Sequence, residues 1–243
     1  MLRLVVCDCD GTLLLENEDR LRNDVIDMIT KITDRKIMFV VASGRCYQDL
    51  KRLFSGVLGR TVFICNDGAV SVYQNSIIDS NTICRSVLAE VAKKFGHVYL
   101  YGVNNTYCIG KDIMPVINES RQVDNLNCVG SGIHKIGFYG IDSRLLLSEL
   151  SMLGLRMSYK SRNWCEFVMD SVDKGVAVSS VMQKFKINYE ESACFGDGIN
   201  DLPMFDRCKE TYAISGSYAA ASGKALFQCD DIVGTILNLL KIK

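Results

Sequence analysis

The fold of this chain is decided close to its N-terminus, by the stretch Val5-Val6-Cys7-Asp8-Cys9-Asp10-Gly11-Thr12-Leu13-Leu14. The apolar run 2–7 predicts a buried strand, and Gly11 predicts a turn directly after it. Asp8 and Asp10 are therefore expected together at the carboxyl end of a strand, where open α/β sheets bind ligands. Two carboxylates this close repel each other, so we expect a bound divalent cation or a division into nucleophile and acid. Taken by itself, the stretch can also be a simple cap of the following helix.

Three further motifs follow in a fixed order. A second apolar strand ends in Ser43-Gly44-Arg45, a helix opens with Asp173-Lys174-Gly175, and a late apolar run ends in Gly196-Asp197-Gly198-Ile199-Asn200-Asp201. With its four motifs in this order, the sequence resembles the haloacid dehalogenase (HAD) superfamily of phosphotransferases. The resemblance is to its Cof-type phosphatase branch, which carries a large cap inserted between the second and third motifs. It covers nearly the whole chain and is weakest in the cap.

The order of predicted elements indicates an α/β fold. Residues 1–80 alternate strands with helices, and residues 166–243 resume this alternation, which predicts a Rossmann-like, doubly wound parallel sheet as the catalytic core. Residues 81–165 follow a different pattern and are predicted to form an inserted α+β cap that sets substrate specificity. The expected core strands are 2–7, 37–42, 61–65, 192–195, 211–214 and 225–227.

The charge of the chain is divided between these two parts. The whole chain has 28 basic and 28 acidic residues, which gives no reason to expect a nucleic-acid or membrane partner. Residues 81–165 hold 10 Lys and Arg against 6 Asp and Glu, a net charge of +4, and the remainder holds 18 against 22, a net charge of −4. A basic lid over an acidic base suits an anionic substrate, although ordinary scatter of surface charge gives the same numbers.

Composition points to a reducing compartment. The 11 cysteines lack Cys-x-x-Cys spacing and lie mostly in apolar runs, so they are expected to be reduced and buried. The apolar runs are shorter than a membrane-spanning helix requires, and the chain opens directly into a strand without a secretion signal. We therefore expect a cytoplasmic protein that is a monomer or a weak homo-oligomer.

The resemblance implies a catalytic role for three residues. Asp8 is implied to be the nucleophile that forms an aspartyl-phosphate, and Asp10 to be the acid that protonates the leaving alcohol and then the base that activates water. Lys174 is implied to neutralise the nucleophile and the phosphate. An Asp at position 10 implies a phosphatase or a mutase, because the ion-pump ATPases and dehalogenases of the superfamily lack it.

The resemblance also implies Mg²⁺ as the cofactor. The implied metal ligands are Asp8, the backbone carbonyl of Asp10, and Asp197, with Asp201 acting through water or from outside the ligand shell. Ser43 is expected at a helix start, where its hydroxyl and the next N–H groups can meet a phosphate oxygen. The residues implied to bind the phosphate are Thr12, Ser43, Gly44 and Asn200.

Two further positions have open interpretations. Asp67 stands in a loop that usually carries Asn-Gly-Ala in the Cof-type branch and faces the substrate there. Its negative charge disfavours contact with a phosphate and suits a sugar hydroxyl better. Arg45 can bind the phosphate or can equally pair with a carboxylate.

These features together predict an Mg²⁺-dependent phosphatase of small phosphate monoesters, with sugar phosphates as the leading class. A phosphomutase on the same scaffold is the close alternative, because the motifs serve both reactions until water or a sugar hydroxyl attacks the aspartyl-phosphate. A non-catalytic sensor of phosphorylated metabolites would be expected to lack Asp8, Asp10, Lys174 or Asp197, and all four are present.

Overall fold

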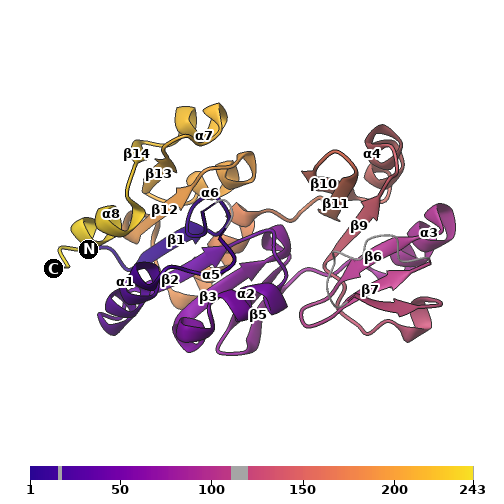
Figure 1. Cartoon of the computed structure of the whole chain (residues 1–243), viewed down its shortest axis with the longest axis horizontal. Coiled ribbons are helices and arrows are strands. Elements are labelled where there is room, and N and C mark those ends of the chain that lie inside the picture. Colours follow the sequence, from indigo (N-terminus) through magenta and orange to yellow (C-terminus); the bar gives the residue numbers. More distant parts are fainter. Residues whose placement is uncertain (16–17, 111–119, 243) are drawn as a thin grey trace.

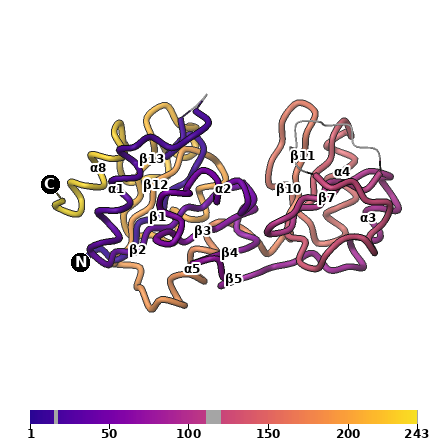
Figure 2. The backbone as a smooth tube through the Cα atoms, turned by 60° about the horizontal axis from the view of Figure 1, so that its bottom comes forward, coloured from indigo at the N-terminus to yellow at the C-terminus, as the bar shows by residue number. Residues whose placement is uncertain are grey.

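The structure is a computed structural model that describes residues 1–15, 18–110 and 120–242, so residues 111–119 of the predicted cap lie outside the described residues. Among the described residues, eight strands form one sheet in the order β14-β13-β12-β1-β2-β3-β4-β5, and six form another in the order β10-β11-β9-β6-β7-β8. Figure 1 shows the two sheets in separate lobes, which the chain joins after β5 and again after β11. The two chain ends lie close together, at the end of the larger lobe that is far from the smaller one (Figure 2).

The larger sheet has a parallel centre, as the sequence predicts. Strand β1 lies between β2 and β12, and both pairings are parallel. The last strand lies at 227–229, two residues after the predicted position. The parallel strands are β1 (Leu4–Asp8), β2 (Met38–Ala42), β3 (Thr61–Cys65), β12 (Ser192–Gly196), β13 (Glu210–Ile214) and β14 (Phe227–Cys229).

Helices cover both faces of this sheet, which makes it doubly wound. Because side chains alternate along a strand, Val5 and Cys7 pack with α1 and α8 on one face, and Leu4 and Val6 pack with α5 on the other. The same alternation places Asp8 on the α5 face. The helices of this lobe are α1 (Asn23–Asp34), α2 (Tyr47–Leu53), α5 (Lys174–Phe185), α6 (Leu202–Phe205), α7 (Ala219–Lys224) and α8 (Ile232–Leu239).

The structure adds an antiparallel hairpin that the sequence analysis does not predict. Strands β4 (Val70–Tyr73) and β5 (Ser76–Ser80) extend the sheet beyond β3. Gln74 and Asn75 form the two-residue connection, and both have positive φ angles, 50° and 61°. Positive φ at both central positions is the geometry of a type I′ turn, a common two-residue hairpin connection. The second strand leads the chain into the smaller lobe.

The smaller lobe is a mostly antiparallel sheet, in which β7 and β8 pair in parallel, with helices on its outer face. Leu88 of α3 and Leu146 of α4 belong to the apolar cluster on that face. The opposite face packs Tyr99 and Trp164 with Cys46 of the larger lobe. The elements are α3 (Arg85–Phe95), β6 (Val98–Tyr101), β7 (Thr106–Ile109), β8 (Ser120–Val123), β9 (Lys135–Tyr139), α4 (Ser143–Ser151), β10 (Leu155–Lys160) and β11 (Trp164–Met169).

The predicted boundary after residue 165 needs a correction. It falls inside β11, which pairs with β10 and β9 of the smaller sheet as far as Met169. The strand alternates between the two faces of that sheet, with Cys165 and Phe167 in its apolar core. The cap strand therefore includes Glu166, and the chain returns to the larger lobe only after Met169.

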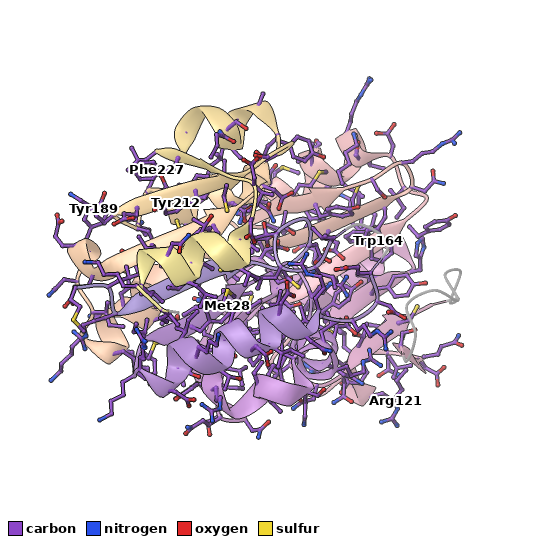
Figure 3. All side chains as sticks on the ribbon, turned by 60° about the vertical axis from the view of Figure 1, so that its left-hand side comes forward. Met28, Arg121, Trp164, Tyr189, Tyr212 and Phe227 are labelled. Carbon is purple, nitrogen blue, oxygen red and sulfur yellow. The ribbon has the colours of Figure 1, made fainter. Side chains whose placement is uncertain are left out.

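Aromatic rings tie the outer strands of the larger sheet together. The ring of Tyr212 stacks on Phe195 at a centroid distance of 4.5 Å and on Phe227 at 5.1 Å. Figure 3 shows Tyr212 and Phe227 side by side on these strands. Stacking of these rings stabilises the packing of β12, β13 and β14 at this edge of the sheet. Across the described residues, every helix is too short or too polar to cross a membrane.

Candidate active site

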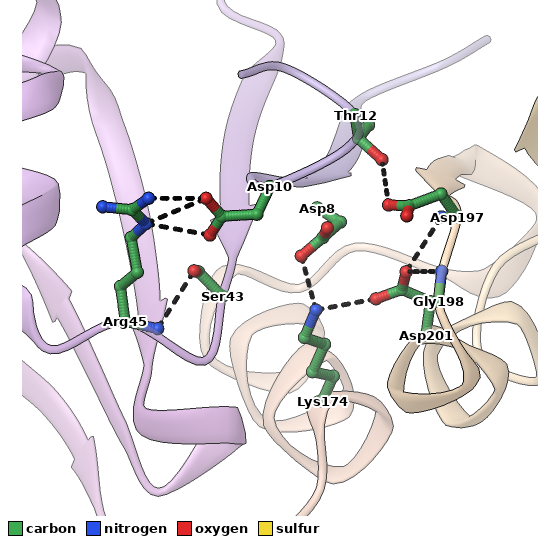
Figure 4. Close-up of polar contacts among 9 residues, drawn as sticks. All are labelled: Asp8, Asp10, Thr12, Ser43, Arg45, Lys174, Asp197, Gly198 and Asp201. Atoms are coloured by element: carbon green, nitrogen blue, oxygen red, sulfur yellow. Dashed lines mark hydrogen bonds and ion pairs between the residues drawn. The ribbon is translucent and has the colours of Figure 1, made fainter. Parts of the chain in front are cut away.

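The predicted catalytic side chains meet at the carboxyl edge of the larger sheet (Figure 4). Asp8 is the last residue of β1, and Asp197 directly follows β12. Lys174 is the first residue of α5, whose first turn is capped by the Asp173 carboxylate, which accepts a hydrogen bond from the Val176 N–H. Because parallel strands end at the same edge, residues far apart in sequence are brought together there.

Lys174 lies at the centre of a buried ion-pair network. Its side chain is 1% exposed, and its Nζ donates to Asp8 Oδ1 at 2.5 Å and to Asp201 Oδ1 at 2.7 Å. Burial opposes the charged form of the lysine, but the negative charges of Asp201 and Asp8 outweigh it and raise the pKa of Lys174. The lysine is therefore a permanent cation against the nucleophile candidate.

The carboxylates around Lys174 form a site that suits a divalent cation. One oxygen from each of Asp8, Asp197 and Asp201 lies within 4.8 Å of the others. Three carboxylates against one ammonium leave two formal negative charges, and burial, reinforced by the charge of Asp201, raises the pKa of Asp8 well above its usual range. Burial likewise raises the pKa of Asp197. Oxygen ligands with this excess charge fit a hard cation such as Mg²⁺.

Two neighbours hold these carboxylates in place. Asp201 Oδ2 accepts hydrogen bonds from the backbone N–H groups of Asp197 at 3.0 Å and Gly198 at 2.9 Å. With its oxygens so engaged, Asp201 is better placed to act through water than as a direct ligand. Gly11 has a φ of +84°, and a Cβ there would lie 2.5 Å from Asp197 Oδ2, so only glycine allows this close approach.

The structure places the Thr12 hydroxyl differently from the prediction. Thr12 Oγ1 donates to Asp197 Oδ1 at 2.9 Å, and the residue is almost fully buried. Its only hydroxyl proton is thus used on a carboxylate. The hydroxyl therefore orients Asp197, and binding of the phosphate by Thr12 stays a prediction.

Asp10 and Arg45 form a two-pronged ion pair. Arg45 Nε donates to both carboxylate oxygens of Asp10, at 3.0 and 2.8 Å, and its Nη2 donates to Oδ1 at 2.6 Å. The hydrogen bond to Asp10 raises the pKa of Arg45 further above its already high value. Of the two roles that the sequence leaves open for Arg45, phosphate binding and pairing with a carboxylate, the structure has the pairing. The pairing fixes the direction of the Asp10 carboxyl group.

The other predicted phosphate-binding residues lie nearby but differ in exposure. Ser43 is fully buried, and its Oγ accepts a hydrogen bond from the Arg45 N–H at 3.1 Å. Helix α2 begins only at Tyr47, so the expectation that Ser43 stands at a helix start is wrong. Gly44 and Asn200 line the cleft, and Asn200 is exposed.

A cleft of about 790 Å³ separates the two lobes at this site. Asp8, Asp10 and Asp197 line one end, and Lys135 and Glu166 of the cap line the opposite wall. The sequence analysis misses both cap residues. The available signal is a charged residue at an inward-facing position of an otherwise apolar strand, because such a residue needs a buried partner.

Comparison with known proteins gives consistent findings. A sequence profile described as haloacid dehalogenase-like hydrolase matches residues 5–232. A phosphoglycolate phosphatase of Thermoplasma volcanium is 28% identical over 215 residues, which cover 85% of this chain and 82% of that protein.

Solved structures share the fold over nearly the full length. A haloacid dehalogenase-like hydrolase from Bacteroides thetaiotaomicron superposes with a TM-score of 0.85 at 19% identity, covering 98% of this chain and 100% of the other. A sugar phosphatase of HAD subclass IIB superposes with a TM-score of 0.79 at 16% identity, covering 99% and 100%. At these identities the likeness shows the architecture of a sheet core with a cap.

Proposed function

The chain belongs to the haloacid dehalogenase-like hydrolases and is a phosphatase of small phosphate monoesters. We propose that it acts through an aspartyl-phosphate on Asp8 and that it requires Mg²⁺. The observation that carries the proposal is the buried contact of Asp8 with Lys174, at 2.5 Å, at the head of an open cleft. A carboxylate held by a permanent cation and facing a cleft is suited to nucleophilic attack on a phosphoryl group.

In the first step, Asp8 attacks the phosphorus atom of the ester. Lys174 holds Oδ1 of Asp8, and the other carboxylate oxygen forms the new bond to phosphorus. The bond from phosphorus to the ester oxygen breaks, and its electron pair stays on the leaving oxygen. The ammonium of Lys174 offsets the negative charge that gathers at the transferring group.

Asp10 is proposed to move the proton in both steps. It protonates the leaving oxygen and later takes a proton from the water that attacks the phosphorus atom, which returns Asp8 as a free carboxylate and releases inorganic phosphate. In the structure, Arg45 donates to both oxygens of Asp10, which is therefore an ionised carboxylate there. We propose that Asp10 leaves this ion pair and takes up a proton from solvent before it protonates the leaving oxygen, because a carboxylate that accepts on both oxygens has no proton to give.

Asp8, the backbone carbonyl of Asp10, and Asp197 are the residues that would hold Mg²⁺, with Asp201 and Thr12 orienting them. When bound, Mg²⁺ supplies positive charge at the phosphoryl oxygens. Sugar phosphates are the proposed substrate class. A cleft of about 790 Å³ has room for a leaving group of several carbon atoms, and a HAD subclass IIB sugar phosphatase has the same fold.

The proposed setting is the cytoplasm, with a small phosphate ester as the partner. All 11 cysteines are free in the structure, and a reducing compartment keeps thiols in that state. The protein is proposed to work as a monomer or a weak homo-oligomer, without nucleic acid. The cap is proposed to contribute to the choice among phosphate esters.

A phosphate-release assay over a panel of metabolites tests the proposed function. The purified protein should release inorganic phosphate with Mg²⁺, EDTA should abolish the release, and added Mg²⁺ should restore it. Ca²⁺ should substitute poorly because it prefers a larger and looser ligand shell. Full activity in metal-free buffer would contradict the proposed metal dependence. Conversion of a sugar phosphate to its isomer without free phosphate would identify a mutase.

A further inference from the structure

We propose that Asp67 determines substrate specificity: its carboxylate accepts a hydrogen bond from a hydroxyl group of the leaving alcohol, and its charge disfavours leaving groups that carry a carboxylate. The inference rests on the proposed phosphatase function and narrows its substrate class to esters of uncharged, hydroxylated alcohols. It is carried by a cluster that joins the two lobes across the cleft, made of Asp67 in the core and Lys135 and Glu166 in the cap.

Asp67 is presented to the cleft by a tightly held loop. The residue follows β3 at the carboxyl edge of the sheet, is 3% exposed and lines the same cleft as Asp8. Its backbone N–H donates to the Ser43 carbonyl at 3.1 Å, and its φ is +58°. Asp and Asn are among the few residues that adopt this left-handed conformation readily, so the loop holds the carboxylate in one direction.

A buried lysine of the cap lies beside this loop. Lys135 Nζ, from β9, donates to the Gly44 carbonyl at 2.6 Å and to Glu166 Oε2 at 2.5 Å. Glu166 Oε1 in turn accepts from the Trp164 indole N–H at 3.0 Å. Both oxygens of the glutamate are thus engaged, and the lysine is fixed between the lobes.

Asp67 is left without a hydrogen-bond donor in this cluster. Its Oδ2 is buried and has no hydrogen-bond partner, and Lys135 Nζ lies 3.7 Å away, too far for a hydrogen bond. A buried carboxylate oxygen without a donor is costly, so a donor from a ligand is favoured there. Asp67 lines the substrate cleft, and a hydroxyl of the leaving alcohol donates the hydrogen bond that the carboxylate lacks.

The charge of the cluster decides which donor fits. Burial opposes the ammonium of Lys135, but Glu166 and Asp67 outweigh it and raise the pKa of the lysine, so it stays charged. Two carboxylates against one ammonium leave one negative charge on this wall. A leaving group with a carboxylate is therefore repelled, whereas a neutral hydroxyl is accepted.

Three substrates of the same reaction test the proposal. Sorbitol 6-phosphate and n-hexyl phosphate have the same number of carbon atoms with and without hydroxyl groups, and 2-phosphoglycolate carries a carboxylate. With Mg²⁺, the wild-type protein should have the highest kcat/KM for sorbitol 6-phosphate, by about tenfold or more over hexyl phosphate. In Asp67→Asn, which the left-handed backbone accepts, a neutral amide oxygen replaces the charged acceptor and makes a weaker hydrogen bond, so this ratio should fall about tenfold. The rate with 2-phosphoglycolate should rise relative to sorbitol 6-phosphate.

Asp49→Asn is the matched control. It removes one negative charge from the same cleft, but the carboxylate of Asp49 is already satisfied by Arg52 and by Cys46 Sγ at 3.2 Å. The sorbitol-to-hexyl ratio in this variant should change by less than about twofold. An equal change in both variants would assign the effect to general charge and would overturn the role of Asp67.

The wild-type protein alone also decides the question. If it hydrolyses hexyl phosphate or 2-phosphoglycolate as well as sorbitol 6-phosphate, the specificity role fails while the phosphatase function stands. An unchanged ratio in Asp67→Asn has the same meaning. If it releases no phosphate from any of the three with Mg²⁺, or from any member of the metabolite panel, the proposed function itself fails.

Discussion

Replacing Lys174 by methionine removes the ammonium that lies between Asp8 and Asp201 and keeps most of the side-chain volume. The lysine is 1% exposed and lies 2.5 and 2.7 Å from the two carboxylates. Both carboxylates stay buried when their cation is lost, and removing one partner of a buried ion pair costs about 3–5 kcal/mol. We therefore expect the free energy of unfolding of Lys174→Met to fall by about 3–5 kcal/mol without metal. Turnover should fall to background.

The assay is urea unfolding followed by circular dichroism, in EDTA and again with saturating Mg²⁺. Mg²⁺ should raise the free energy of unfolding more in Lys174→Met than in the wild type, because a divalent cation replaces the missing charge among the carboxylates. A double variant, Lys174→Met with Asp201→Asn, should regain part of the loss, since it removes an unpaired charge together with its partner.

Lys224→Met is the control for the removal of a lysine as such. Lys224 pairs with Asp206 at 2.6 Å, but both side chains are well exposed, and exposed pairs contribute about 0–1 kcal/mol. Equal stability of Lys174→Met and Lys224→Met in EDTA would refute the reasoning, because it would mean that the buried carboxylates do not need the ammonium of Lys174.

Three further predictions follow from the same structure. Asp8→Asn should reduce kcat by a factor of about 10⁴ or more while the circular dichroism spectrum stays native, since the attacking charge and a metal ligand are lost but the shape of the side chain is kept; near wild-type turnover would contradict the mechanism. Cys9→Ala should keep most activity and lose about 1 kcal/mol of stability, because Cys9 is a fully buried core residue; loss of turnover in a stable, Mg²⁺-binding variant would show a missed role. Burial lowers the pKa of His134 to about 4, so the stability that its neutral form contributes is complete above about pH 6.5 and is lost as the pH falls towards 4, by up to about 3 kcal/mol. His134→Gln, which can keep the bond to Ser80 Oγ, should lose this part of the pH dependence in urea unfolding across pH 4–7; identical pH profiles would contradict it.

Local patterns of the sequence were sufficient for most elements of the fold and for the catalytic motifs. The strand Thr61–Cys65 occurs with the predicted bounds, and the predicted helix opens at Lys174, because apolar spacing and capping residues act within a few positions. The order of the motifs likewise placed Asp8, Asp197 and Lys174 at one edge, since parallel strands end together. The burial of most cysteines likewise followed from their place in apolar runs.

Contacts between distant segments came only from the tertiary structure. The pairing of Arg45 with Asp10, the use of the Thr12 hydroxyl on Asp197 and the position of Lys135 beside Asp67 depend on how loops and lobes pack. The membership of β11 in the cap depends on its pairing with β9 and β10, which no local pattern of residues specifies. The sequence by itself therefore determined the phosphatase family and the predicted catalytic motifs, because these motifs lie within single strands and helices. The tertiary structure decided which residues line the cleft. These residues come from distant segments of the chain, and no regular spacing in the sequence brings them together.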